Sequence, residues 1–334
     1  MKTLLRNINI IKNNEISYGY DILINGDKIE KIDKNMIVSD TKSINCDNYF
    51  VRSGFVNCCF DESCNIKNQA INGVTTIVCL NNDLNKALLL KEMGFTVYFG
   101  IGVFNDAEYV NFQILQEKYI NLLKNDIKCV LFAKNSFTTD ENVFSDLVKF
   151  SKEFDLPILT VTNETLYEVG ECDKVNGFTP VRLLEEYGVL DRPHMLLGCE
   201  NCDKDDVEIM QYHDTYVCVT PTKSLRLGNG VAPVYSMIKN GVGVCLGGDN
   251  FLKEISLVSD LQSGVLNESG LVSNLDLDNI ISINPNKFLK QSAGEIRIGN
   301  HADLIVLDTP SILDLNTSNV LYTIANGKVI YKKQ

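Results

Sequence analysis

Thiol and carboxylate side chains gather in the stretch VRSGFVNCCFDES, residues 51–63, which contains Cys59 and Asp61. The same side-chain types recur at Cys199, the first residue of a Cys-x-x-Cys pair, and at Asp249, in the string GGDN. Thiolate and carboxylate groups are both ligands of zinc, and thiolates also bind iron. One hypothesis is therefore a zinc or iron site held by these four side chains, with no imidazole among its ligands.

Cys59 has a second chemical interpretation, as a covalent nucleophile. A catalytic thiol needs a base or a positive neighbour to form the thiolate. The chain has only three histidines, and Lys134 is the single cation that we expect near Cys59. A partly buried thiol that fills space is the simpler alternative, and it remains open beside the other two.

The composition excludes several classes of partner. A formal net charge of -12 over 334 residues argues against a nucleic-acid partner, which would require a basic face. Polar residues interrupt the first twenty positions, and no apolar run approaches the ~20 residues of a membrane-spanning helix. We therefore expect a cytoplasmic protein without membrane contact, whose 11 cysteines stay reduced.

The two ends of the chain predict β-structure. Apolar residues alternate on both sides of an Asn-Gly turn in DILINGDKIEKID (21–33) and again in VLYTIANGKVIY (320–331). Asn-Gly between alternating apolar residues is the strongest short hairpin signal. We therefore expect residues 1–50 and 288–334 to form one small β-sandwich domain.

The middle of the chain, residues 51–287, alternates strand-like and helix-like segments. Near-continuous apolar strands that are each followed by a helix indicate a parallel sheet covered on its outer face. Eight such units favour a (β/α)8 TIM barrel over an open doubly wound sheet. The helix before the fifth strand has Thr139 or Asp140 in position to cap it. The eight expected strands span residues 49–57, 73–80, 95–102, 127–133, 156–162, 194–199, 215–221 and 241–248.

Several strings resemble the amidohydrolase superfamily, in the branch of guanine and cytosine deaminases, adenosylhomocysteine-type deaminases and triazine chlorohydrolases. The most specific are TPTKSLRLGNGVAPVYSMIKNGVGVCLGGDN (220–250), GEIRIGNHADLIVLD (294–308) and IANGKVIY (324–331). SGFVN (53–57) resembles the family's lead-in to the first barrel strand. The resemblance runs along nearly the whole chain, and it implies the barrel and a deaminase-type hydrolysis of non-peptide C–N bonds.

The resemblance also implies a divalent metal at the carboxyl-terminal mouth of the barrel, which activates a water molecule. The family's His-x-His pair falls here on Cys59 and Asp61. The histidine after the fifth strand falls on Val161, the one after the sixth on Gly198, and the family's final aspartate is Asp249.

Other family positions give the same picture. Two further histidines of relatives fall on Lys134 and Val219, whereas an acidic residue that contacts substrate in relatives is present as Glu164. Each of these acidic residues also has a structural interpretation. Asp249 can cap the following turn or helix, and Glu164 can be an ordinary surface-loop residue. The segment 61–70 that follows the first barrel strand is shorter than in relatives.

These departures predict that metal-dependent catalysis is lost or strongly impaired and that no cofactor is bound. Two alternatives remain. One is an active hydrolase with a substitute metal site at Cys59, Asp61, Cys199 and Asp249. The other is a non-catalytic subunit that binds a small-molecule ligand or forms a homodimer, as barrels of this family do.

Overall fold

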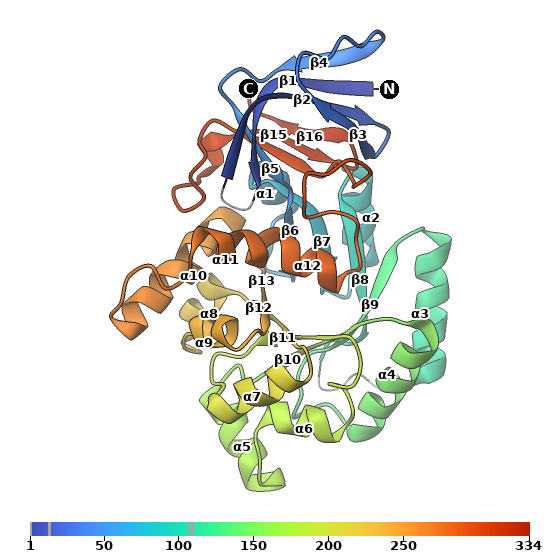
Figure 1. Cartoon of the computed structure of the whole chain (residues 1–334). Helices are drawn as coiled ribbons and strands as arrows, with labels where there is room; N and C mark the ends of the chain where they lie inside the picture. The colour runs from blue at the N-terminus through green and yellow to red at the C-terminus, as the bar shows by residue number, and fades with distance from the viewer. Residues whose placement is uncertain (1, 13–14, 106–107, 109) are drawn as a thin grey trace.

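The computed structural model describes residues 2–12, 15–105, 108 and 110–334. Within this part of the chain there are two eight-stranded sheets, one mixed and one parallel. Figure 1 shows the mixed sheet at one end of the molecule, where both chain termini lie, and the parallel sheet with its helices below it. No helix in the described residues is long and apolar enough to cross a membrane.

The β-structure expected from the two chain ends is present as one mixed sheet with strand order β16-β15-β14-β5-β1-β2-β3, in which β4 pairs with β1. Its strands come from both ends of the chain because β5 pairs in parallel with β1 and antiparallel with β14. The strands are β1 (Lys2–Lys12), β2 (Glu15–Asn25), β3 (Lys28–Asp33), β4 (Thr41–Asn45), β5 (Phe50–Ser53), β14 (Leu304–Leu307), β15 (Val320–Ala325) and β16 (Lys328–Lys332).

Both predicted Asn-Gly hairpins are confirmed, and their turns contact each other. The turns join β2 to β3 and β15 to β16, with positive φ angles of 62° at Gly26 and 72° at Gly327. A Cβ atom at Gly327 would lie 1.9 Å from the carbonyl oxygen of Gly26. The close approach of the two backbones therefore requires glycine at position 327.

The parallel sheet is the predicted barrel, with strand order β13-β12-β11-β10-β9-β8-β7-β6. Its first strand differs from the expectation of one strand over 49–57. Phe50–Ser53 pairs in the mixed sheet, and the barrel begins only after Gly54, because the chain passes from one sheet to the other there. The barrel strands are β6 (Phe55–Phe60), β7 (Val74–Cys79), β8 (Thr96–Val103), β9 (Lys128–Ala133), β10 (Ile158–Thr162), β11 (His194–Gly198), β12 (Tyr216–Val219) and β13 (Gly243–Leu246).

A side-chain amide joins the last barrel strand to the first. Asn57 in β6 donates from Nδ2 to the carbonyl oxygen of Gly248 over 2.8 Å, and its Oδ1 accepts from the Gly248 amide at 3.2 Å. Asn57 is fully buried, and Nδ2 also donates to Gln69. The two bonds to Gly248 mimic one rung of a β-ladder and so connect the ends of the sheet.

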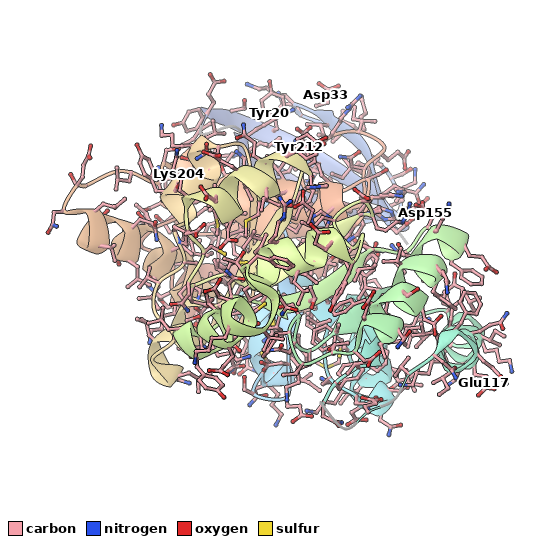
Figure 2. The ribbon with its side chains drawn as sticks, turned by 90° about the horizontal axis from the view of Figure 1, so that it is seen from below. Tyr20, Asp33, Glu117, Asp155, Lys204 and Tyr212 are labelled. Carbon is pink, nitrogen blue, oxygen red and sulfur yellow. The ribbon has the colours of Figure 1, made fainter. Side chains whose placement is uncertain are left out.

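The helices lie on the outside of the barrel, and their caps follow from local sequence. Asp140 accepts from the Asn142 amide, which selects Asp140 over Thr139 as the cap of α4. Figure 2, seen from below, shows the side chains of the outer helices, with Lys204 and Tyr212 at the two ends of α7. The helices are α1 (Ile66–Ile71), α2 (Leu84–Glu92), α3 (Phe112–Lys124), α4 (Glu141–Phe154), α5 (Leu166–Asn176), α6 (Pro180–Glu186), α7 (Lys204–Tyr212), α8 (Pro221–Leu227), α9 (Val234–Lys239), α10 (Phe251–Leu266), α11 (Asn274–Asp278) and α12 (Asn284–Phe288).

Two short irregular helices complete the described chain. The π-helical turn Asn279–Ile283 joins α11 to α12, and the 3-10 turn Thr317–Asn319 precedes β15. The barrel interior is apolar and closely packed, because alternate residues of each strand point inward. These inward residues include Val56, Cys58, Val78, Val130, Leu159, Met195, Cys218 and Cys245.

Candidate functional site

The first predicted ligand positions lie at the carboxyl end of β6, the end of the barrel at which loops join strands to helices. Cys59 packs among the inward residues of the barrel and is 8% exposed. Burial, together with the negative charge of Asp61, raises the pKa of Cys59 to about 12 against the opposing charge of Lys223. The thiol therefore stays protonated at neutral pH, which argues against Cys59 as a nucleophile.

Asp61 is held in an ion pair rather than left free. Its Oδ2 lies 3.1 Å from Nζ of Lys223, and its Oδ1 accepts from the amide of Ser63 at 2.9 Å. Burial works to raise the pKa of Asp61, but the bonds from Ser63 and the charge of Lys223 outweigh it and hold the pKa below its ordinary value. Asp61 is therefore an ionised carboxylate with a fixed cation as its partner.

The cation beside Cys59 is not the one that we predicted. Lys134 lies exposed directly after β9, whereas the charge that acts on the Cys59 thiol belongs to Lys223, in the first turn of α8. Burial works to lower the pKa of Lys223, but the neighbouring Cys59 and Asp61 outweigh it and raise the pKa. A positive charge is unfavourable in the first turn of a helix because it opposes the helix dipole. The unusual position of Lys223 is therefore the sequence signal that could have identified this lysine as a functional cation.

The positions of the fifth- and sixth-strand ligands hold no donor side chain. Val161 is half-buried at the end of β10 and packs against the inward cluster. Gly198 ends β11 with φ of 95°, and a Cβ there would lie 2.9 Å from Oε2 of Glu200. The carboxylate of Glu200 thus occupies space beside Gly198 that a larger side chain would need.

Glu200 was missed at the sequence level, although it follows β11 by only two residues. It is 7% exposed, and its Oε1 accepts a hydrogen bond from the hydroxyl of Ser224. Burial raises the pKa of Glu200, and the nearby Glu164 raises it further. The predicted substrate-contact residue Glu164 is half-buried in the loop after β10, on the same side of the barrel.

Asp249 has a structural role, but it is not the cap of the following turn or helix that the sequence offered as an alternative, because Asn250 caps α10. Its Oδ1 accepts from the Asn65 amide at 2.6 Å, and its Oδ2 accepts from the side chain of Asn68 at 3.0 Å. Asn65 is the N-cap of α1, so Asp249 ties the loop after β13 to the segment that follows β6. Both carboxylate oxygens are already engaged.

The three histidines lie away from this end of the barrel. His194 is the first residue of β11, at the opposite end of the strand from Gly198. His213 caps the end of α7 and contacts Glu185, with 3.1 Å between Nε2 and the carboxylate. His301 forms an isolated bridge with Lys28 of the mixed sheet.

A cavity of about 330 Å³ lies at the other end of the barrel, where β8 to β11 begin. Its lining includes Tyr98, Leu156 and Phe288, and two of its charged groups pair with each other, with 2.5 Å between Lys290 Nζ and the Asp155 carboxylate. We place the candidate site at the carboxyl end instead, because unpaired acidic groups, a fixed cation and loop residues meet there.

A family model described as the amidohydrolase family matches residues 65–330. The chain therefore belongs to the amidohydrolase family. A 5-methylthioadenosine/S-adenosylhomocysteine deaminase of Caldicellulosiruptor saccharolyticus is 26% identical over an alignment of 238 positions, which covers 65% of this chain and 56% of that protein. A 5'-deoxyadenosine deaminase of Methanocaldococcus jannaschii is 28% identical over an alignment of 214 positions, which covers 61% of this chain and 49% of that protein. The chain thus spans about half the length of these curated relatives.

Solved structures of amidohydrolase-type proteins have the same fold. A guanine deaminase from C. acetobutylicum, solved with guanine bound, covers 99% of this chain and 100% of its own, with a TM-score of 0.82 and 15% identity. An atrazine chlorohydrolase from Arthrobacter aurescens, complexed with zinc, covers 98% of this chain and 94% of its own, with a TM-score of 0.83 and 15% identity. At this identity the likeness establishes the fold alone.

The donor set of this amidohydrolase does not fit the metal that the family implies. Val161 and Gly198 offer no ligand atom, and Asp61 and Asp249 are already bonded to protein groups. Cys199 packs in the outer core, whereas Cys59 belongs to the inward cluster, so the two thiols face different compartments. The described residues contain no group of three or more His, Cys, Asp or Glu side chains arranged to hold a metal ion.

Proposed function

We propose that this amidohydrolase-family barrel binds a small-molecule ligand at its mouth and does not carry out the metal-dependent hydrolysis of its relatives. The observation that carries the proposal is the ion pair that Lys223 of α8 forms with Asp61, which the resemblance places at the second histidine of the family's His-x-His pair. A fixed ammonium group beside Cys59 and Asp61 repels a divalent cation from the place where the family holds one.

The state of the remaining groups supports the same proposal. A metal-activated water needs at least three protein ligands and an open coordination position. Cys59 is a protonated thiol, and both carboxylate oxygens of Asp249 accept hydrogen bonds, from Asn65 and Asn68. Glu164 remains in the loop after β10, so the mouth keeps one group of the kind that contacts substrate in relatives.

The test is elemental analysis of protein purified without chelators and without a histidine affinity tag, followed by turnover assays. We expect less than about a tenth of an equivalent of zinc, iron or nickel per chain, since fewer than three free ligands remain. We also expect no deamination of 5'-deoxyadenosine, 5-methylthioadenosine or S-adenosylhomocysteine when zinc or iron is added. These compounds are the substrates in the names of the relatives.

Two results would overturn this proposal. The first is stoichiometric metal that is lost in Asp249→Ala or in Cys59→Ala. The second is metal-dependent deamination that those variants abolish. Either result would favour the substitute site of Cys59, Asp61, Cys199 and Asp249 as an active hydrolytic centre.

A further inference from the structure

Glu200 has one carboxylate oxygen that the rest of the protein leaves without a partner. Oε1 accepts from Ser224, but Oε2 is buried and has no hydrogen-bond partner among the described residues. Buried carboxylate oxygens are normally bonded, because an unsatisfied one loses its hydration without compensation. An orphan oxygen of this kind in a residue that is 93% buried points to a group that the chain itself does not supply.

The orphan oxygen lies beside Gly198 and occupies the space that a side chain at this position would need. Oε2 of Glu200 lies 2.9 Å from the position of a Cβ at Gly198, and the carbonyl oxygen of Thr162 lies 3.4 Å from the same point. The Cβ of Glu164 is 3.6 Å away from that point. Two glutamates and a carbonyl oxygen therefore surround a glycine that presents no side chain.

The negative charges of Glu164 and Glu200 beside Gly198 are not balanced by a cation of their own. Lys223 is the cation that acts on Glu164 and Glu200, but its ion pair is with Asp61. Neither glutamate has an ion-pair partner within 4.0 Å in the described part of the chain. A positively charged hydrogen-bond donor would satisfy Oε2 and balance the surplus negative charge.

Apolar side chains stand on the neighbouring strands at the same end of the barrel. Phe104 follows β8 and Phe132 is next to last in β9, with 5.1 Å between their ring centroids. Leu80 and Val161 belong to the same cluster. Leu80 and Phe132 are each only 5% exposed, so Phe104 and Val161, which are half-buried, are the members on which a flat, apolar body can pack while its polar end reaches the glutamates.

We propose that the mouth binds its ligand through a cationic nitrogen group, an ammonium or amidinium, that donates to Oε2 of Glu200 and to the carboxylate of Glu164. Glu200 thereby takes over the place beside Gly198 that a metal or substrate-polarising ligand holds in relatives. This inference rests on the proposed function, because it assigns the ligand class of the same mouth.

The experiment compares three probes of one shape by isothermal titration calorimetry at pH 7.5: benzamidine, which is cationic, benzamide, which is neutral, and benzoate, which is anionic. Wild-type protein is expected to bind benzamidine at least about tenfold more tightly than the other two, as a charge-assisted bond implies. Glu200→Gln and Glu164→Gln are each expected to lower the affinity for benzamidine by a similar factor.

Glu208→Gln is the matched control, because it removes the same charge from α7 at an exposed residue paired with Lys204 at 3.1 Å. Its affinity for benzamidine should equal that of the wild type. Urea unfolding verifies that each variant is folded, and Glu164→Gln carries the test if Glu200→Gln does not fold.

Equal affinity of wild type and both glutamate variants would overturn the inference and assign Oε2 to an internal water, for which the adjoining cavity of about 20 Å³ has room. Equal affinity for benzoate, or no binding of benzamidine, would overturn it as well. Metal content and deaminase turnover are measured on the same preparation. Measurable deaminase turnover would overturn only the proposed function. Equal affinity for the cationic, neutral and anionic probes would overturn only this inference.

Discussion

The ammonium group of Lys223 lies 3.1 Å from the carboxylate of Asp61, at the carboxyl end of the barrel. The pair links the segment after β6 to the first turn of α8, and the two residues are 162 positions apart in the sequence. It places a positive charge beside the thiol of Cys59. Because neither partner is deeply buried, its main effect is on local charge rather than on stability.

Replacing Lys223 by Met should raise the pKa of Asp61, because the cation that helps hold it down is lost. The free energy of unfolding should fall by only about 1 kcal/mol or less, as is typical of exposed pairs. Carbon-detected NMR titration of Asp61 and urea unfolding measure the two effects. Lys134→Met, at an exposed lysine, should change neither quantity. An unchanged Asp61 titration in Lys223→Met would contradict the pairing.

Asp249→Ala should loosen the segment after β6 without changing the metal content. The variant removes the acceptors for the Asn65 amide and for the side chain of Asn68. The amide of Asn65 should exchange with solvent about tenfold faster or more, as expected when a hydrogen bond worth about 1.5 kcal/mol is lost. Asp260→Ala, at an exposed position of α10, is the control. Unaltered exchange at Asn65 would refute the structural role of Asp249.

Arg52 connects the mixed sheet to the segment after the barrel. Its Nη1 lies 2.6 Å from Oδ1 of Asp278, and Nη2 donates to the carbonyl oxygen of Pro310 at 2.8 Å. Arg52→Met leaves a mostly buried Asp278 unpaired and should lower the free energy of unfolding by roughly 3 kcal/mol.

The loss in Arg52→Met should be smaller at pH 5 than at pH 7. Burial already raises the pKa of Asp278, and without Arg52 the carboxyl group becomes neutral more easily. Arg182→Met removes an exposed arginine that is paired with Glu185, and it should cost less than about 1 kcal/mol. Equal losses in the two variants would show that the buried pair has no special role.

Asn57→Ala should weaken the connection between β13 and β6. The variant leaves the amide and carbonyl groups of Gly248 without their partner, which predicts a loss of about 2–3 kcal/mol in the free energy of unfolding. Asn45→Ala, at an exposed asparagine of β4, should change stability by less than about 0.5 kcal/mol. Guanidinium unfolding of both variants measures the difference, and equal midpoints would exclude this role for Asn57.

His194 makes stability depend on pH in a defined direction. Nδ1 is 2.7 Å from the Arg192 carbonyl oxygen, which only accepts, so Nδ1 donates, and Nε2 lies 2.8 Å from the hydroxyl of Thr215. A neutral ring with its proton on Nδ1 satisfies both contacts, because Nε2 then accepts from the hydroxyl. Burial lowers the pKa of His194 to about 4 from its ordinary 6.5.

Between these two pKa values the unfolded chain binds a proton at His194 that the folded chain does not bind. Stability from this group is therefore complete above pH 6.5 and is lost as the pH falls toward 4. From pH 7 to pH 5, wild type should lose about 2 kcal/mol more than His194→Gln, because one pKa unit corresponds to 1.36 kcal/mol. Urea unfolding at both pH values gives this difference, in which other titrating groups cancel. Parallel pH profiles would contradict it.

The local pattern of the sequence determined most of the fold. Asn-Gly turns between alternating apolar residues specify hairpins by backbone geometry alone, and both were found where expected. Buried parallel strands read as continuous apolar runs, so the eight barrel strands were also found, with the first one starting after Gly54 instead of at residue 49. The break at Gly54 was hidden because residues 50–60 are apolar on both sides of it, although they belong to different sheets.

The sequence also determined that the side chains of Val161 and Gly198 cannot bind a metal, because a valine or a glycine offers no donor side chain wherever it lies. Which groups surround these two residues was decided by tertiary structure. Lys223 and Glu200 meet Asp61, Glu164 and Gly198 only because parallel strands bring their carboxyl ends to one edge of the barrel. The ion pair of Lys223 and Asp61 depends on the distance between segments that are far apart in the sequence, and so does the burial that leaves Oε2 of Glu200 without a partner. Residue spacing along the chain does not reveal such distances.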